Sequence, residues 1–194
     1  GINPNVLNML NTRYVIVPTD QGPQVQRNPG APGCVWFVNE IRWVNSPDEE
    51  IVALNDFNPV RTAVIDKAWQ ADLPSWQQLA SSDSAATIRL TDYPAPDRLL
   101  YESQSASPRL AVFSEVFYKT WHAYIDGREV KPIRVDYILR GLEIPAGTHK
   151  IEFRCVDDVY LRSARISLIA SIVVGVVFLA LLGMAVRSAV VRKA

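Results

Sequence analysis

Aromatic and charged side chains gather in one stretch of the sequence in a combination that can bind a sugar. Tyr118, Trp121 and Tyr124 lie close to Asp126, and Arg140 lies further along the chain. Aromatic rings pack against the apolar face of a sugar ring, and charged groups can pair with its hydroxyls. Aromatic residues in strands also pack in cores or against neighbouring strands. A glycan-contact patch made by these five residues is therefore one of two interpretations.

The titratable residues show no spacing that is typical of catalysis. Neither His122 nor His149 has neighbours at metal-ligand or nucleophile spacing, and no GxSxG, HExxH or glycine-rich nucleotide motif occurs. The acids at 48–50 begin an expected helix, where the helix dipole accounts for them. The acids at 157–158 precede an apolar run. They are either solvated or in contact with a cation or a lipid headgroup. We expect no catalytic residue, no metal site and no cofactor.

The composition narrows the class of protein. The 194 residues carry 20 Lys and Arg against 20 Asp and Glu, so the net charge is zero. A nucleic-acid-binding protein would need a basic surface, so we expect no nucleic-acid partner. The two cysteines, Cys34 and Cys155, are too few for a disulfide scaffold. A disulfide bond between them in an oxidising compartment is one of two alternatives.

The run from Ile166 to Val186 contains no charged residue. At about 1.5 Å per residue it makes a helix of roughly 31 Å, which matches the hydrocarbon core of a bilayer. A buried helix of a soluble core is the alternative, but such helices are usually shorter and carry a polar stripe. We therefore expect a β-rich domain at 1–160, a juxtamembrane link at 161–165, a transmembrane helix at 166–186 and a basic tail at 187–194.

Small residues recur along one side of the expected transmembrane helix. A close approach between membrane helices requires small side chains at their interface. The spacing therefore predicts a helix-packing face for neighbouring transmembrane helices. Its members are Ser167, Ser171, Gly175 and Gly183.

The charges that flank the run predict its orientation. The rule that cytoplasmic flanks are richer in Lys and Arg counts mainly these two residue types. The tail carries Arg187, Arg192 and Lys193, and the preceding flank carries Arg162 and Arg165. We expect the tail in the cytoplasm and the main domain outside. Because no apolar leader follows Gly1, we also expect earlier membrane spans in a longer protein. A cytoplasmic domain with a tail anchor is a third possibility.

Strand patterns dominate the expected domain. A short helical stretch precedes a strand at 13–17, a loop covers 19–33, and a second strand covers 35–44. Ser46 and Pro47 begin a short helix that ends near Asn55, and a strand follows at 61–66. An irregular segment at 67–85, with a helical turn at 74–80, leads into strands from Ala86 onward. About eight strands and one or two short helices predict a mainly β fold, an antiparallel β-sandwich-like domain.

The clearest pattern predicts a three-stranded meander. The dipeptide Asp126-Gly127 is typical of a tight hairpin turn, and a second turn is expected at 145–147. Alternating apolar residues predict one buried face and one solvated face for all three strands. Asp136 and Arg140 fall on the solvated face of the middle strand. Cys155 points inward with the apolar residues of the last strand.

The same stretch, residues 114–155, resembles the C-terminal region of the YfhO family of bacterial membrane proteins. The resemblance rests on the SE-x-x-Y motif from Ser114 to Tyr118 and on the W-x-x-Y-x-D-G motif from Trp121 to Gly127. It also rests on the Pro-Ala-Gly turn and on the segments LNMLNTRYVIVP and WFVNEIRWVNSPDEEIVALN. The chain departs from the family at 119–120, where a glycine usually precedes the tryptophan, and at 155–158, where a proline-containing turn is common.

The resemblance implies the C-terminal accessory domain and last membrane helix of a polytopic protein similar to GT-C glycosyltransferases. Such enzymes transfer sugars from lipid phosphates to envelope glycans, and their catalytic acid is expected in an early loop outside this sequence. The implied location is the bacterial inner membrane, with the main domain extracytoplasmic. The implied partners are the membrane, neighbouring transmembrane helices and an envelope glycan. A noncatalytic envelope module that binds a protein partner is the alternative.

Overall fold

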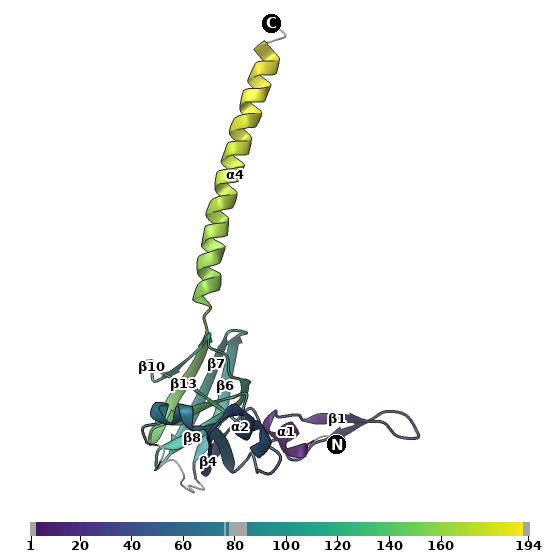
Figure 1. Ribbon diagram of the computed structural model, residues 1–194, viewed down its shortest axis with the longest axis vertical. Coiled ribbons are helices and arrows are strands. Elements are labelled where there is room, and N and C mark those ends of the chain that lie inside the picture. The colour runs from purple at the N-terminus through teal and green to yellow at the C-terminus, as the bar shows by residue number, and fades with distance from the viewer. Residues whose placement is uncertain (1–2, 76, 78–84, 192–194) are drawn as a thin grey trace. The chain divides into compact units, whose positions relative to one another are not determined.

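The computed structural model describes residues 3–75, 77 and 85–191, and the chain forms two units, Gly1–Cys155 and Val156–Ala194. The first unit is mainly β, as the sequence predicts, with antiparallel pairing in both of its larger sheets. One sheet has the strand order β10-β9-β13-β7-β6 and the other β11-β12-β8-β3 (Figure 1). Their strands are β3 (Val35–Val38), β6 (Thr87–Ala95), β7 (Arg98–Ser105), β8 (Arg109–Val116), β9 (Trp121–Ile125), β10 (Arg128–Val130), β11 (Ile133–Val135), β12 (Leu139–Ile144) and β13 (Gly147–Cys155).

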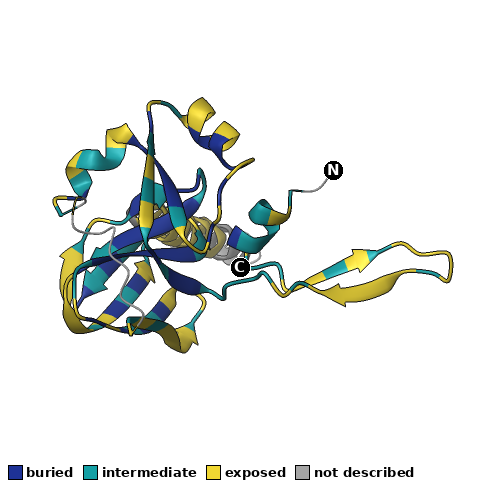
Figure 2. Cartoon of the chain, turned by 90° about the horizontal axis from the view of Figure 1, so that it is seen from below, coloured by how far each residue is buried: buried dark blue, intermediate teal, exposed yellow. Residues whose placement is uncertain are grey.

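Two apolar clusters show how these sheets are layered. One cluster joins the inner faces of the five-stranded and four-stranded sheets and includes Phe113 of β8 and Phe153 of β13. The other lies on the opposite face of the four-stranded sheet and includes Leu110 and Val112. Strand β8 is therefore buried along most of its length, and this is why its sequence does not alternate. Figure 2 shows these buried strands inside the domain.

Short elements cover the outer face of the four-stranded sheet. They are helix α1 (Pro4–Met9), helix α2 (Pro47–Ala53) and the parallel pair β4 (Glu40–Val44) and β5 (Thr62–Asp66). The helix expected after Ser46 is confirmed, because the Ser46 hydroxyl accepts a hydrogen bond from the Glu49 amide at 3.2 Å. The segment expected to be irregular contains a 3-10 helix, η1 (Lys67–Asp72). Most of the turn predicted at 74–80 lies outside the described residues.

The strand predicted at 35–44 is wrong as a single element. The backbone breaks at Asn39, where the Asn39 and Glu40 amides both donate to the Arg61 carbonyl at 2.8 and 2.9 Å. As a result β3 and β4 belong to different sheets. The predicted loop at 19–33 also contains a strand, β2 (Gln24–Arg27), which pairs with β1 (Tyr14–Val17). This hairpin, which we call the arm, projects from the domain (Figures 1 and 2).

The predicted meander is also wrong, because its middle strand is three strands in two sheets. β10 pairs with β9 in the five-stranded sheet, whereas β11 and β12 belong to the four-stranded sheet. The chain crosses between the sheets at Pro132, which has no amide hydrogen for a ladder. It turns again where Asp136 and Tyr137 adopt φ angles of 49° and 69°. Strand β13 then pairs with both β9 and β7.

Two side chains assigned to the solvated face of that meander are buried. Asp136 is 0% exposed and Arg140 is 1% exposed. The period-two pattern, which only Ile138 interrupts, assigned both residues to the solvated face, but the left-handed turn and the change of sheet place them against other elements. Cys155 is half-buried and its Sγ lies 3.3 Å from the Thr120 hydroxyl. Both cysteines are free thiols in this structure.

The second unit is helix α4 (Asp158–Val191), which is helical through the segment expected as a link at 161–165. Its stretch Val159–Met184 is long and apolar enough to cross a membrane. None of this stretch is buried against the rest of the described chain. On the predicted packing face, the Ser171 hydroxyl donates to the Ser167 carbonyl at 2.8 Å. A methyl group added at Gly175 or Gly183 would meet open space.

Candidate functional site

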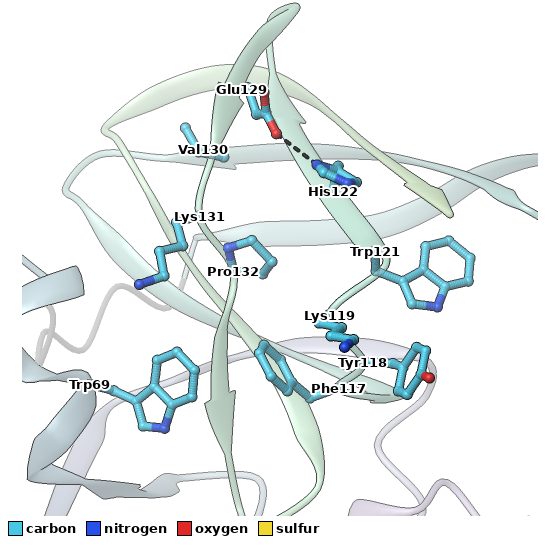
Figure 3. Close-up of a pocket in the computed structure, with 10 residues that line it drawn as sticks. All are labelled: Trp69, Phe117, Tyr118, Lys119, Trp121, His122, Glu129, Val130, Lys131 and Pro132. Atoms are coloured by element: carbon cyan, nitrogen blue, oxygen red, sulfur yellow. Dashed lines mark hydrogen bonds and ion pairs between the residues drawn. The ribbon is translucent and has the colours of Figure 1, made fainter. Parts of the chain in front are cut away.

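A groove of about 650 Å³ opens on the β-rich unit beside η1 and the segment that connects β8 to β9. Figure 3 shows Lys119 between Phe117 and Tyr118, with the pair His122 and Glu129 further along the strands. Such a mixture of apolar rings and a few polar groups is typical of small-molecule sites. The groove is lined by Trp69, Phe117, Tyr118, Lys119, Trp121, His122, Glu129, Val130, Lys131 and Pro132.

The aromatic residues of the groove come from two elements far apart in sequence. Trp69 lies on η1 and packs edge-to-face against Phe117, with ring centroids 5.3 Å apart and an interplanar angle of 72°. The Phe117 amide donates to the Ile138 carbonyl at 2.6 Å. The Trp121 amide donates to the Tyr118 carbonyl at 3.0 Å, so a tight turn presents Trp121 at the start of β9. Backbone hydrogen bonds therefore hold three of the four rings near their positions.

Arg140 lies behind Trp121 and fixes its ring. The guanidinium carbon is 4.3 Å from the centroid of Trp121 and 4.8 Å from that of Phe153, so the cation is stacked between two rings. Its Nη2 donates to Glu115 at 3.2 Å. Burial lowers the pKa of Arg140, and Glu115 opposes this shift, so the group stays charged. Arg140 thus covers one face of the indole, and the half-buried Trp121 also lines the groove.

Charged side chains form the rim. Lys131 donates to Asp72 at 2.7 Å, and its Nζ lies 5.6 Å from the centroid of Trp69. His122 Nδ1 and Glu129 Oε1 are 2.8 Å apart across the β9–β10 hairpin. Lys119 makes no hydrogen bond or ion pair with any residue that the structure describes. The rim therefore offers both donors and acceptors to an oxygen-rich ligand.

The structure brings together only part of the glycan-contact patch predicted from the sequence. Tyr118 and Trp121 line the groove, and Arg140 supports Trp121 from behind. Tyr124 lies on the outer face of the sheet under the Arg154 guanidinium, at 4.6 Å from its ring centroid. Asp126 lies in the β9–β10 turn, outside the groove. The sequence-based patch did not include Trp69, Phe117 or Lys131. Trp69 comes from the segment that was expected to be irregular.

Asp126 instead joins two turns of the domain. Its Oδ2 is 2.7 Å from His149 Nδ1, and its Oδ1 accepts the Lys150 amide at 2.9 Å. The other nitrogen of His149 lies 3.1 Å from the Ala146 carbonyl. The hydrogen bond to Asp126 raises the pKa of His149, and the same bond lowers the pKa of Asp126. Since both histidine nitrogens face acceptors, this geometry suits the doubly protonated ring.

Two further carboxylates, those of Glu50 and Asp136, are buried and have a structural role. Glu50 of α2 accepts the Tyr137 amide at 2.8 Å and Arg134 Nη2 at 2.7 Å. Asp136 Oδ1 accepts the Val64 amide at 2.7 Å. Burial raises the pKa of both acids, to about 8 for Asp136. No group of three or more metal-ligating side chains occurs among the described residues, so we assign no metal to these carboxylates.

Comparisons with known proteins give no functional assignment. No family model, curated protein or solved structure matches this sequence or its fold.

Proposed function

We propose that this chain is a membrane-anchored domain that binds an envelope glycan in the aromatic groove. The observation that carries the proposal is the Trp121 indole, which is supported by Arg140 and lines a groove that aromatic and charged side chains also line. The apolar C–H face of a sugar ring packs against such an indole face. Its hydroxyls need hydrogen-bond partners, and charged side chains that line the groove, such as Lys119 and Lys131, can supply them.

We further propose that the chain is the C-terminal accessory domain and last membrane helix of a polytopic YfhO-like membrane protein. In this proposal the parent protein is a glycosyltransferase of the bacterial inner membrane that uses lipid-linked sugars. The β-rich domain is extracytoplasmic, and the basic tail at 187–194 is cytoplasmic. The length of α4, the cations of the tail and the sequence resemblance support the proposal. The domain would hold or position the acceptor glycan, and the chemistry would belong to the rest of the protein.

The full chain in lipid nanodiscs provides the test of glycan binding. Oligosaccharides released from bacterial envelopes are titrated while tryptophan fluorescence and binding heat are recorded. Trp121→Ala should weaken binding about tenfold or more, and Trp121→Phe should restore most of it because the ring is kept. Tyr118→Ala should weaken binding, and Tyr93→Ala is its matched control, since these tyrosines are 57% and 56% exposed and Tyr93 lies outside the groove. Failure of every envelope oligosaccharide to bind would overturn the proposal.

A second candidate function is a noncatalytic envelope module that binds a protein partner. The arm favours it, because Tyr14, Ile16 and Val25 share one face of the β1–β2 ladder and are 64%, 69% and 67% exposed. A two-stranded hairpin with such a face is at best marginally stable in water without a cover.

Site-specific photo-crosslinking in native membranes tests this candidate. A crosslinking amino acid at Ile16 should capture a discrete protein if the arm is an interface. The same amino acid at Gln26, on the opposite face of the ladder, is the control. Equal yields from both positions would count against a specific partner.

A further inference from the structure

The rings that line the groove form two separate pairs. Trp69 packs with Phe117, whereas Trp121 follows Tyr118 through a hydrogen-bonded turn. Figure 3 shows the two pairs at opposite sides of the groove, with Lys119 between them. A sugar ring stacked on one indole would leave the other indole unoccupied. The groove thus has more aromatic surface than one sugar ring can cover.

Each tryptophan is held by its own neighbours. Trp121 is supported by Arg140, which is 1% exposed. Trp69 is held edge-to-face by Phe117 and lies below the Lys131 ammonium, which Asp72 fixes. The two supports share no residue and come from different elements. Removal of one ring should therefore leave the other ring in place.

The charged pairs near the groove are placed differently relative to the two indoles. Lys131 and Asp72 lie at 2.7 Å from each other beside Trp69, whereas His122 and Glu129 lie at 2.8 Å from each other on the face of β9 opposite to Trp121. A hydroxyl-bearing ring needs one stacking surface and a few donors and acceptors at its edge. The Trp69 half of the groove meets this need by itself. Lys119, between the halves, can donate to the oxygen atoms that link two sugars.

We infer that the groove contains two sugar subsites and binds a linear oligosaccharide of at least two rings, one on Trp121 and one on Trp69. This inference rests on the proposed glycan binding and specifies its ligand class. The Trp121 subsite comprises Tyr118 and Trp121, and the Trp69 subsite comprises Trp69, Phe117 and Lys131. The linkage between the rings lies at Lys119.

A series of sugars of increasing length tests the two-subsite inference directly. N-acetylglucosamine and its β-1,4-linked dimer and tetramer are titrated into the full chain in lipid nanodiscs, with glucose and its α-1,4-linked oligomers as a second series. The dimer of the preferred series should bind about tenfold more tightly than its monomer, because a second stacked ring adds to the binding free energy. A monomer that binds as tightly as the dimer overturns the two-subsite inference and leaves glycan binding intact. Binding of neither series counts against the proposed function itself, and the inference fails with it.

Variants at the two tryptophans separate the subsites. Trp69→Ala should reduce the affinity for the dimer to that for the monomer, and Trp69→Phe should retain most of the gain. Tyr118→Ala and Lys131→Met change more exposed side chains, so they test each half without a large change in the core. Circular dichroism and thermal unfolding confirm that each variant is folded. If Trp69→Ala weakens monomer and dimer by the same factor, the groove is one continuous site and the inference is wrong.

Discussion

Arg140 shows how a buried charge can support a binding surface. The cation lies between Trp121 and Phe153 in the core of the sandwich, where burial penalises its charge. The two ring faces and the carboxylate of Glu115 offset this penalty. Its position explains how an aromatic residue at the start of β9 packs against the core and still lines the groove.

Asp136 provides a prediction about pH and stability. Its pKa is raised by burial to about 8, so the folded chain keeps a proton that the unfolded chain loses above about pH 4. The stabilisation from this proton is fully present below about pH 4 and is lost as the pH rises through about 8. Asp136→Asn keeps the acceptor for the Val64 amide but cannot titrate. The variant should gain stability relative to the parent chain by on the order of a few kcal/mol between pH 4 and 8.

Urea unfolding of both proteins at several pH values checks this prediction. The free energies of unfolding of the two proteins should diverge as the pH rises. A constant difference across that range would show that Asp136 is ionised in the folded chain. The left-handed φ of 49° at this position is well tolerated by asparagine, so the backbone is preserved.

Asp126 and His149 give a second prediction at the residue scale. The carboxylate raises the pKa of His149 above its ordinary 6.5, and the pKa of Asp126 is lowered below 3.8. The bond therefore stabilises the two turns between the pKa of Asp126 and that of His149. It weakens when acid protonates Asp126 or when base deprotonates His149.

Nuclear magnetic resonance titration of the His149 ring checks the sign of this shift. In Asp126→Asn the pKa of His149 should fall toward or below 6.5, because the neutral amide does not favour the imidazolium. Asparagine accepts the left-handed φ of 50° and can still accept the Lys150 amide, so the hairpin should persist. An unchanged His149 pKa would show that the ring is bound mainly through the Ala146 carbonyl.

At the scale of elements, Gly141 determines how closely β12 packs on β11. A methyl group at this position would lie 2.5 Å from Val135 Cγ1 and 3.1 Å from Ile133 Cγ1. All three residues are buried, so the neighbours have little room to move. Gly141→Ala should destabilise the domain by about 1–3 kcal/mol through overpacking. Gly127→Asn, in the exposed β9–β10 turn where asparagine is tolerated, should change the unfolding free energy much less.

The same elements show what the sequence could and could not predict. The turn at Asp126-Gly127, the helix start at Ser46 and the apolar run were predicted, because each depends on local chemistry. The crossing at Pro132 was missed, because a period-two pattern looks the same in one strand as in two strands of different sheets. The Trp69 half of the groove was missed for a related reason. Its contact with Phe117 is a tertiary contact between distant segments, which no local pattern encodes.

At the scale of the whole molecule, the apolar helix and the β-rich domain impose different requirements. A stretch such as Val159–Met184 is stable in a bilayer, whereas the charged rim of the groove requires water. In the proposed membrane-anchored protein, the domain therefore lies on one side of the membrane. The side determines whether the groove can meet an envelope glycan.

The distribution of cations predicts which side this is. Arg187, Arg192 and Lys193 follow the apolar run at 166–186 and outnumber Arg162 and Arg165 before it, which favours a cytoplasmic tail. In the native protein in intact cells, with Cys34 and Cys155 replaced by serine, Asp20→Cys at the end of the arm should react with a membrane-impermeant maleimide. Ser188→Cys in the tail should react only after the cells are opened. Labelling of both after lysis is the control for reactivity. The reverse pattern would place the groove in the cytoplasm and would rule out an extracytoplasmic glycan as its ligand, even if the purified chain binds sugars.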